Sequence, residues 1–184
     1  YEKKASPILN GLWNERQITD LLYSTLSIKK WFIEIDEFDK SERRLLNFGH
    51  TWGHALESAT GFKITHGLAV AIGMMASVLF VKNDYYAESL FIHCLNLLSP
   101  ILQEEHLNKF NSKLFVQAFT SDKKHTNDFY HLIVPSPLTR EQSLGVREIK
   151  VPSNNKSLDL ILQAIEEALN ILRLEITSKA SMRS

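Results

Sequence analysis

Apolar residues recur every three or four positions along most of this chain of 184 residues, which is the spacing of amphipathic α-helices. The pattern predicts helices over residues 14–31, 41–60, 66–83, 86–98, 112–119 and 157–174. It changes at residues 128–134 and 146–151, where short runs rich in β-branched and aromatic residues predict two strands. We therefore expect a mainly α fold with one small β-hairpin.

Polar residues and glycine indicate where these helices begin and end. Ser41 and Thr65 are suitable N-caps, and Gly61 suits a C-terminal stop. The apolar run 67–81 is shorter than the roughly 20 residues of a membrane-spanning helix, so it predicts a buried helix. The small and polar residues 177–184 predict a flexible tail that follows a domain of residues 1–176.

Glycine is concentrated in one part of the chain, since five of the seven glycines lie between residues 49 and 73. Gly49 and Gly53 fall inside the helix predicted over residues 41–60. Each costs about 1 kcal/mol there relative to alanine. Two such positions four residues apart predict the close approach of a neighbouring helix.

Charge and cysteine content narrow the class of protein. Lysine plus arginine and aspartate plus glutamate both number 21, so the chain lacks the basic excess of nucleic-acid and anionic-membrane binders. The single cysteine, Cys94, cannot form an internal disulfide, and we expect it to pack inertly in a helix. No signal peptide is visible, which favours a cytoplasmic protein. The first residue is Tyr1 rather than methionine, which predicts a domain of a longer protein.

The most informative polar pattern lies in the helix predicted over residues 41–60. Arg43, Asn47, His50 and His54 follow one another at steps of four, three and four, which places them on one face of a helix. A guanidinium, an amide and two imidazoles on one face indicate a surface that binds a charged group. The alternative for Arg43 is an ordinary surface ion pair with a neighbouring acid: Asp39, Glu42 or Glu57.

Histidine spacing adds a candidate metal site. His50 and His54, one helical turn apart, form a common metal platform, and His66 follows a short loop that allows it to come back to face them. Spacing alone nominates all three as ligands. The alternative is three unrelated histidines that form local hydrogen bonds.

Basic residues near this pattern suit a small molecule that carries several negative charges. Arg43 can bind a carboxylate or a phosphate through two hydrogen bonds. Lys29 and Lys30 precede it, and Lys123 and Lys124 come just before the predicted hairpin. No GxGxxG, Walker, GxSxG or CxxC motif is present, so the residues of this chain predict no dinucleotide site.

Residues 43–57 read RRLLNFGHTWGHALE and residues 66–74 read HGLAVAIGM. Together they closely resemble the signature of 3-dehydroquinate synthase and its sugar-phosphate cyclase relatives. The resemblance extends upstream to Lys29 and the acidic pair Asp36-Glu37, and downstream to residues 122–124, so that it spans most of residues 14–175.

The resemblance implies a two-domain enzyme, of which this chain is the helical C-terminal domain that binds metal and substrate. The NAD-binding N-terminal domain is then absent from the chain. In the family one glutamate and two histidines hold a divalent metal, usually zinc, with cobalt as an alternative. The resemblance gives the histidine roles to His50 and His66, places the glutamate in the missing region, and makes His54 a residue that contacts substrate.

The remaining residues of the motif are implied to contact the substrate and to support catalysis: Lys29, Arg43, Asn47, and one of Lys123 or Lys124. The implied reaction belongs to the shikimate pathway of aromatic amino acid biosynthesis. It converts 3-deoxy-arabino-heptulosonate 7-phosphate into 3-dehydroquinate with loss of phosphate, through an NAD- and metal-dependent carbon–oxygen lyase. The full-length enzyme is expected to be a cytoplasmic homodimer, and the isolated domain is expected to be inactive.

Two other readings stay open. One is a related sugar-phosphate cyclase of the 2-deoxy-scyllo-inosose synthase type. The other is a catalytically inactive relative with a structural role.

Overall fold

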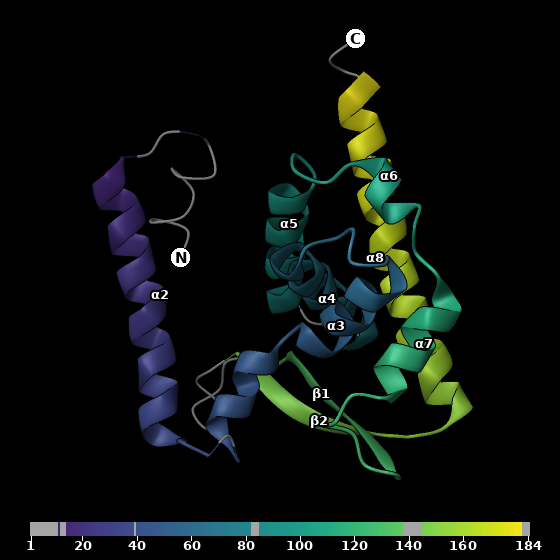
Figure 1. Ribbon diagram of the computed structural model, residues 1–184, viewed down its shortest axis with the longest axis horizontal. Coiled ribbons are helices and arrows are strands. Elements are labelled where there is room, and N and C mark those ends of the chain that lie inside the picture. The colour runs from purple at the N-terminus through teal and green to yellow at the C-terminus, as the bar shows by residue number, and fades with distance from the viewer. Residues whose placement is uncertain (1–10, 12–13, 39, 82–84, 138–144, 182–184) are drawn as a thin grey trace. The chain divides into compact units, whose positions relative to one another are not determined.

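The computed structural model describes residues 11, 14–38, 40–81, 85–137 and 145–181. The chain divides into two units, Tyr1–Leu46 and Asn47–Ser184. The predicted mainly α fold with one small hairpin is confirmed, because helices alternate with loops along the chain and one antiparallel pair of strands interrupts them (Figure 1). Among the described residues, no helix combines the length and the apolar composition needed to cross a bilayer.

The first unit contains the long helix α2, Glu15–Ile35, and the turn that follows it. Asn14 begins α2 with a capping box, in which its side chain accepts a hydrogen bond from the Gln17 backbone and the Gln17 side chain accepts one in return. The helix runs four residues beyond the predicted end at Trp31. It ends at the buried Asp36, whose carboxylate accepts hydrogen bonds from several backbone N–H groups of the turn: those of Lys40, Ser41 and Arg43.

The single helix predicted over residues 41–60 is wrong. A short 3₁₀ helix, η1, covers Glu42–Asn47, and the α-helix α3 covers His50–Ala59. Between them Gly49 has a φ of 75°, a left-handed conformation that ends one helix and starts another, and that glycine adopts at little cost. The expected row from Arg43 to His54 is therefore divided between two elements.

Close packing of a neighbouring helix against the glycines is confirmed. The partner is α4, His66–Val81. A Cβ atom on Gly53 would lie 3.0 Å from the Val70 Cα, and a Cβ atom on Gly73 would lie 2.1 Å from the Gly49 carbonyl oxygen. The backbones of α3 and α4 approach each other more closely than side chains at these positions would allow.

Helix α4 is largely buried, as its apolar sequence predicted, and it lies at the centre of the second unit. It packs against α3, against α5 (Tyr85–Leu98), against α8 (Asn155–Ser181) and against the first strand (Figure 1). On the core side of α3, the fully buried Trp52 contacts the rings of Phe80 and Phe119. Cys94 of α5 is buried, which confirms its predicted packing in a helix, and burial raises the pKa of its thiol to about 11.

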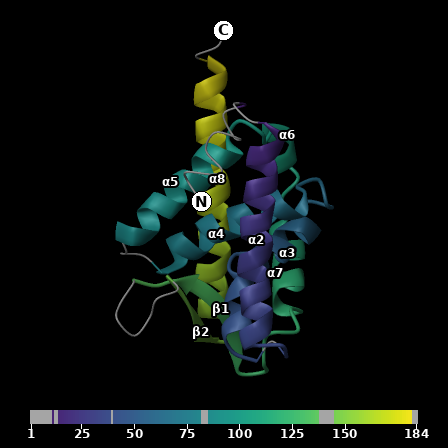
Figure 2. The same ribbon diagram turned by 90° about the vertical axis from the view of Figure 1, so that its left-hand side faces the viewer.

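The predicted hairpin consists of β1, Phe129–Pro135, and β2, Val146–Pro152. The strands pair antiparallel with Leu132 opposite Ile149. Both views place the hairpin near the beginning of α8 (Figures 1 and 2). Two helices lie between α5 and β1. The first is the short α6, Glu104–Leu107, which the sequence pattern did not predict. The second is α7, Ser112–Thr120, which agrees with the helix predicted over residues 112–119.

Helix α8 continues further than the predicted end near Leu174. It remains helical to Ser181, where Lys179 pairs with Glu175 at 2.9 Å and donates a hydrogen bond to Ser99 at 2.7 Å. Residues 177–181 of the predicted tail are therefore helical, and residues 182–184 lie outside the described part of the chain.

Candidate metal centre

Three imidazoles lie together where α3 and α4 begin. The ring centroid of His50 is 5.6 Å from that of His54 and 5.4 Å from that of His66, and the last two rings are 5.5 Å apart. His50 and His66 are the first residues of their helices. The prediction that His66 comes back to face the first two histidines is confirmed.

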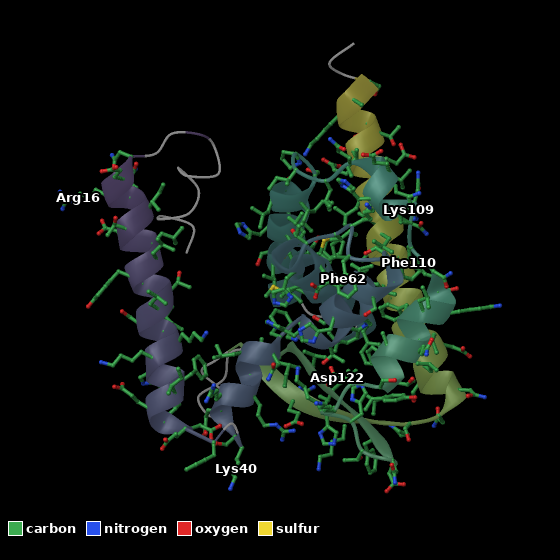
Figure 3. All side chains as sticks on the ribbon, viewed as in Figure 1. Arg16, Lys40, Phe62, Lys109, Phe110 and Asp122 are labelled. Carbon is green, nitrogen blue, oxygen red and sulfur yellow. The ribbon has the colours of Figure 1, made fainter. Side chains whose placement is uncertain are left out.

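The loop between α3 and α4 makes this return possible. Gly61 and Phe62 both have left-handed backbone conformations, with φ of 58° and 60°. The backbone N–H of Phe62 donates a hydrogen bond to the Glu57 carbonyl, which closes the end of α3. The Phe62 side chain, labelled in Figure 3, is exposed. Two consecutive left-handed residues reverse the chain tightly, so α4 begins beside α3.

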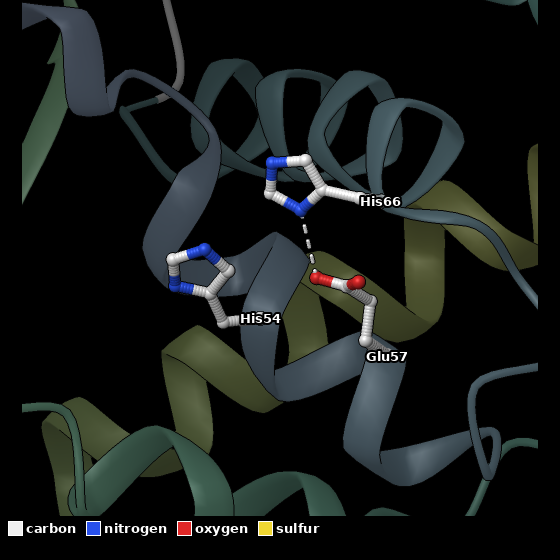
Figure 4. Close-up of side chains that lie close together, drawn as sticks. All are labelled: His54, Glu57 and His66. Atoms are coloured by element: carbon white, nitrogen blue, oxygen red, sulfur yellow. Dashed lines mark hydrogen bonds and ion pairs between the residues drawn. The ribbon is translucent and has the colours of Figure 1, made fainter.

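Two of the three imidazoles have a defined tautomer, because one ring nitrogen lies next to an oxygen atom. The Nδ1 atom of His50 is 3.1 Å from the Phe48 carbonyl oxygen, and the Nδ1 atom of His66 is 3.0 Å from Oε2 of Glu57 (Figure 4). A carbonyl or carboxylate oxygen only accepts, so each Nδ1 carries the hydrogen. The Nε2 atom of each neutral ring then keeps its lone pair.

Glu57 is a site residue that the sequence analysis did not assign. His54, Glu57 and His66 each place one potential ligand atom within 4.8 Å of the others. Glu57 follows His54 by three residues and His50 by seven, so helical spacing places it on the same face. That spacing is the signal that was available in the sequence.

The surroundings of His50 and His54 favour the neutral form of their rings. Burial lowers the pKa of His50 and that of His54, and the positive charge of Lys124 lowers both further. Neutral imidazole and carboxylate are among the usual ligands of zinc in proteins. The residues present therefore fit a zinc-type ion, and they would also accept cobalt.

Of the two candidate lysines near the hairpin, Lys124 is the one whose charge acts on the imidazoles. Its backbone N–H donates to the Asp122 side chain at 3.0 Å, which defines the turn after α7. Lys124 is half-buried, whereas Lys123 is exposed. The positive charge of Lys124 therefore belongs to the electrostatic environment of His50 and His54.

The other predicted substrate contacts are divided between the two units. Lys29 is exposed on α2, and the Arg43 guanidinium donates a hydrogen bond to the Glu37 carbonyl oxygen at 2.8 Å. Asn47 is half-buried in the second unit, three residues before His50. That Lys29 and Arg43 converge on the imidazoles stays a prediction.

The lowered histidine pKa values predict a pH dependence of stability in the metal-free protein. The pKa of His50, His54 and His125 lies below the ordinary value of about 6.5, mainly because of burial. As the pH falls below about 6.5, the unfolded chain therefore binds protons that the native chain does not. We expect a lower free energy of unfolding at pH 5.5 than at pH 7.5, measured by urea denaturation with a chelator present. A double variant, His50→Gln with His54→Gln, should show a smaller decrease, and an equal decrease would contradict this origin.

The fold and site together define a helical domain with a candidate metal centre built from imidazole and carboxylate groups. Residues 1–125 match the family model described as 3-dehydroquinate synthase C-terminal. The chain belongs to the 3-dehydroquinate synthase family.

Individual relatives agree with this assignment. A 3-dehydroquinate synthase from Clostridium tetani is 34% identical over 160 residues, which cover 85% of this chain and 40% of the relative. Another from Clostridium botulinum is 57% identical over 122 residues, which cover 64% of this chain and 34% of the relative. The chain spans about two fifths or less of the length of these curated relatives.

Proposed function

We propose that this chain is the metal- and substrate-binding domain of a 3-dehydroquinate synthase. The complete enzyme would convert 3-deoxy-arabino-heptulosonate 7-phosphate into 3-dehydroquinate with loss of phosphate. The observation that carries the proposal is the cluster of three imidazoles, two of which already donate Nδ1–H to an oxygen, in a chain that matches the family.

In this proposal His50 and His66 hold a divalent metal through Nε2, with zinc as the expected ion and cobalt as the alternative. A further carboxylate ligand would come from the part of the enzyme outside this chain. When bound, the metal would supply Lewis-acid chemistry toward substrate oxygens, and NAD, held outside this chain, would supply the hydride chemistry. The residues of this domain themselves would bind the substrate, orient it and transfer protons.

His54 is suited to move a proton. Its side chain is exposed, and among the described residues its ring has no hydrogen-bond partner. Part of the ring is nevertheless shielded from solvent, and this partial desolvation, together with the charge of Lys124, lowers its pKa. The ring is therefore neutral at neutral pH and able to accept a proton from a substrate hydroxyl. The imidazolium formed can return that proton later in the reaction.

The cationic residues would bind the two ends of the substrate. Lys124 adds a positive charge next to the imidazoles. We propose that Lys29, Arg43 and Asn47 bind the carboxylate, the hydroxyls and the phosphate. A substrate with a carboxylate at one end and a phosphate at the other needs several such donors at once.

The proposal includes the setting in which the enzyme acts. We propose that the full-length protein is a homodimer, that it acts in the cytoplasm, and that the isolated domain has no turnover. The expected inactivity of the isolated domain is supported by the length of the relatives named 3-dehydroquinate synthase, of which this chain covers about two fifths.

Replacing Arg43 by alanine in the complete protein should leave the metal bound and weaken substrate binding. Loss of a charge-assisted pair of hydrogen bonds is worth about 1.5–3 kcal/mol, so we expect the KM to rise about 10- to 100-fold. Zinc content and steady-state kinetics measure the two effects separately. Lys40→Ala, which removes one positive charge from the same turn, is the matched control, and an unchanged KM in Arg43→Ala would argue against the anion-binding role.

Product analysis tests the function as a whole. The complete protein is incubated with 3-deoxy-arabino-heptulosonate 7-phosphate, and the release of phosphate and of 3-dehydroquinate is followed. Turnover of a hexose phosphate instead would identify a cyclase of the 2-deoxy-scyllo-inosose synthase type. Bound zinc without turnover of either substrate would identify a catalytically inactive relative.

A further inference from the structure

We infer that Glu57 is a positioning residue of the metal centre: its carboxylate accepts Nδ1–H of His66 and thereby directs the Nε2 atom of His66 to the metal. This inference rests on the proposed function and assigns a role in it to a residue outside the predicted site.

The geometry of the pair carries the inference. Oε2 of Glu57 lies 3.0 Å from Nδ1 of His66, and the two residues belong to different helices (Figure 4). The His66 side chain is 55% exposed, so little packing restricts its rotation, whereas the Glu57 side chain is 15% exposed. The less mobile carboxylate therefore orients the more exposed ring.

The same arrangement recurs at the other histidine assigned to the metal. Nδ1 of His50 is next to the Phe48 carbonyl oxygen, and His54 has no comparable partner among the described residues. Histidines that bind metals usually donate their second ring N–H to a carboxylate or a backbone carbonyl, which fixes the tautomer and strengthens the ligand. The hydrogen bonds thus separate His50 and His66, as ligands, from His54.

The competing role for Glu57 is direct coordination, because its carboxylate also lies within 4.8 Å of potential ligand atoms of His54 and His66. Direct coordination would place the ion against a carboxylate whose Oε2 already accepts Nδ1–H of His66. The ion would draw on the same carboxylate charge and so weaken the hydrogen bond that orients this ring. The observed hydrogen bond favours the positioning role.

Metal binding by variants of the complete protein distinguishes the roles. Zinc affinity is measured by competition with a chromophoric chelator in the wild type and in Glu57→Ala, Glu57→Gln and His66→Ala. We expect Glu57→Ala to bind zinc about 10- to 100-fold more weakly, as for other residues that orient a metal ligand. Glu57→Gln should recover most of the affinity, because an amide oxygen still accepts Nδ1–H. The Co²⁺ absorption spectrum of Glu57→Gln should match that of the wild type.

A matched control comes from the hairpin. There Glu148 pairs with His131 at 2.6 Å, which is also a carboxylate–imidazole pair. Glu148→Gln should leave the zinc affinity unchanged. Urea denaturation of each metal-free variant separates a loss of metal ligation from a loss of folding.

The outcomes separate the inference from the proposed function. If Glu57→Gln is as damaging as Glu57→Ala and changes the Co²⁺ spectrum, Glu57 is a direct ligand and the positioning role is wrong. If His66→Ala weakens zinc binding but Glu57→Ala does not, the positioning role is wrong and the metal centre stands. If the wild type and His66→Ala bind zinc equally well or not at all, the metal centre and this inference both fail.

Discussion

His66→Ala is expected to abolish both metal retention and turnover in the complete protein. The variant removes an Nε2 donor from the imidazole cluster at the beginning of α4. Residues that only orient a ligand already cost about 10- to 100-fold in metal affinity, so loss of the ligand itself should cost more than about 100-fold. Zinc per protein, measured by elemental analysis after dialysis, and the rate of phosphate release check the two effects.

Folding should survive this change. The His66 side chain is 55% exposed at the first position of α4, so its removal leaves no cavity. His106→Ala, which replaces a histidine of α6, is the control and should keep zinc and activity. Stoichiometric zinc and full activity in His66→Ala would remove the ligand assignment.

Gly73→Ala is expected to lower the free energy of unfolding by about 3 kcal/mol, at the upper end of the cost of overpacking a core. The added Cβ would lie 2.1 Å from the Gly49 carbonyl oxygen and 2.9 Å from the Gly53 backbone nitrogen. Both obstacles are backbone atoms, so no side chain can rotate out of the way. Relief requires α3 to move relative to α4, and that movement also displaces His50 and His54.

Gly67→Ala is the matched control in the same helix. Apart from its chain neighbours and the backbone of its own helix, no atom lies within 4 Å of the position where its Cβ would be, so the change in stability should stay within about 1 kcal/mol. The free energy of unfolding of both variants is measured by urea denaturation, monitored by tryptophan fluorescence, to which the buried Trp52 contributes. A Gly73→Ala variant as stable as the wild type would contradict the close contact between the two helices.

Much of the fold follows from local pattern. The hairpin and the helices α4, α5 and α7 agree with their predicted ranges within a few residues, because each has strong apolar periodicity and clear ends. The break at Gly49 was not predictable in this way. Its left-handed conformation accompanies a contact with Val70 and Met74 of α4, which are more than twenty residues away in the chain.

The site was predictable to a similar extent. Helical spacing and one short loop were enough to bring His50, His54 and His66 together. Glu57 was missed because its partner depends on how tightly the chain reverses at Gly61 and Phe62, which the loop sequence does not reveal. The choice of Lys124 over Lys123 likewise depends on the conformation of a turn.

The contact of α3 with α4 through Gly49, Gly53 and Gly73 limits how far the proposed site could adjust to the size of a bound ion. Backbone atoms of the two helices are in direct contact there, so a change of side-chain rotamer cannot alter the spacing between the helices. Any accommodation to ions of different radius is left to the torsion angles of the histidine rings themselves and to the reversal at residues 61–65. In the proposed metal centre, selectivity among metals would then depend on a fixed spacing of α3 and α4 and on the rotation of the histidine side chains.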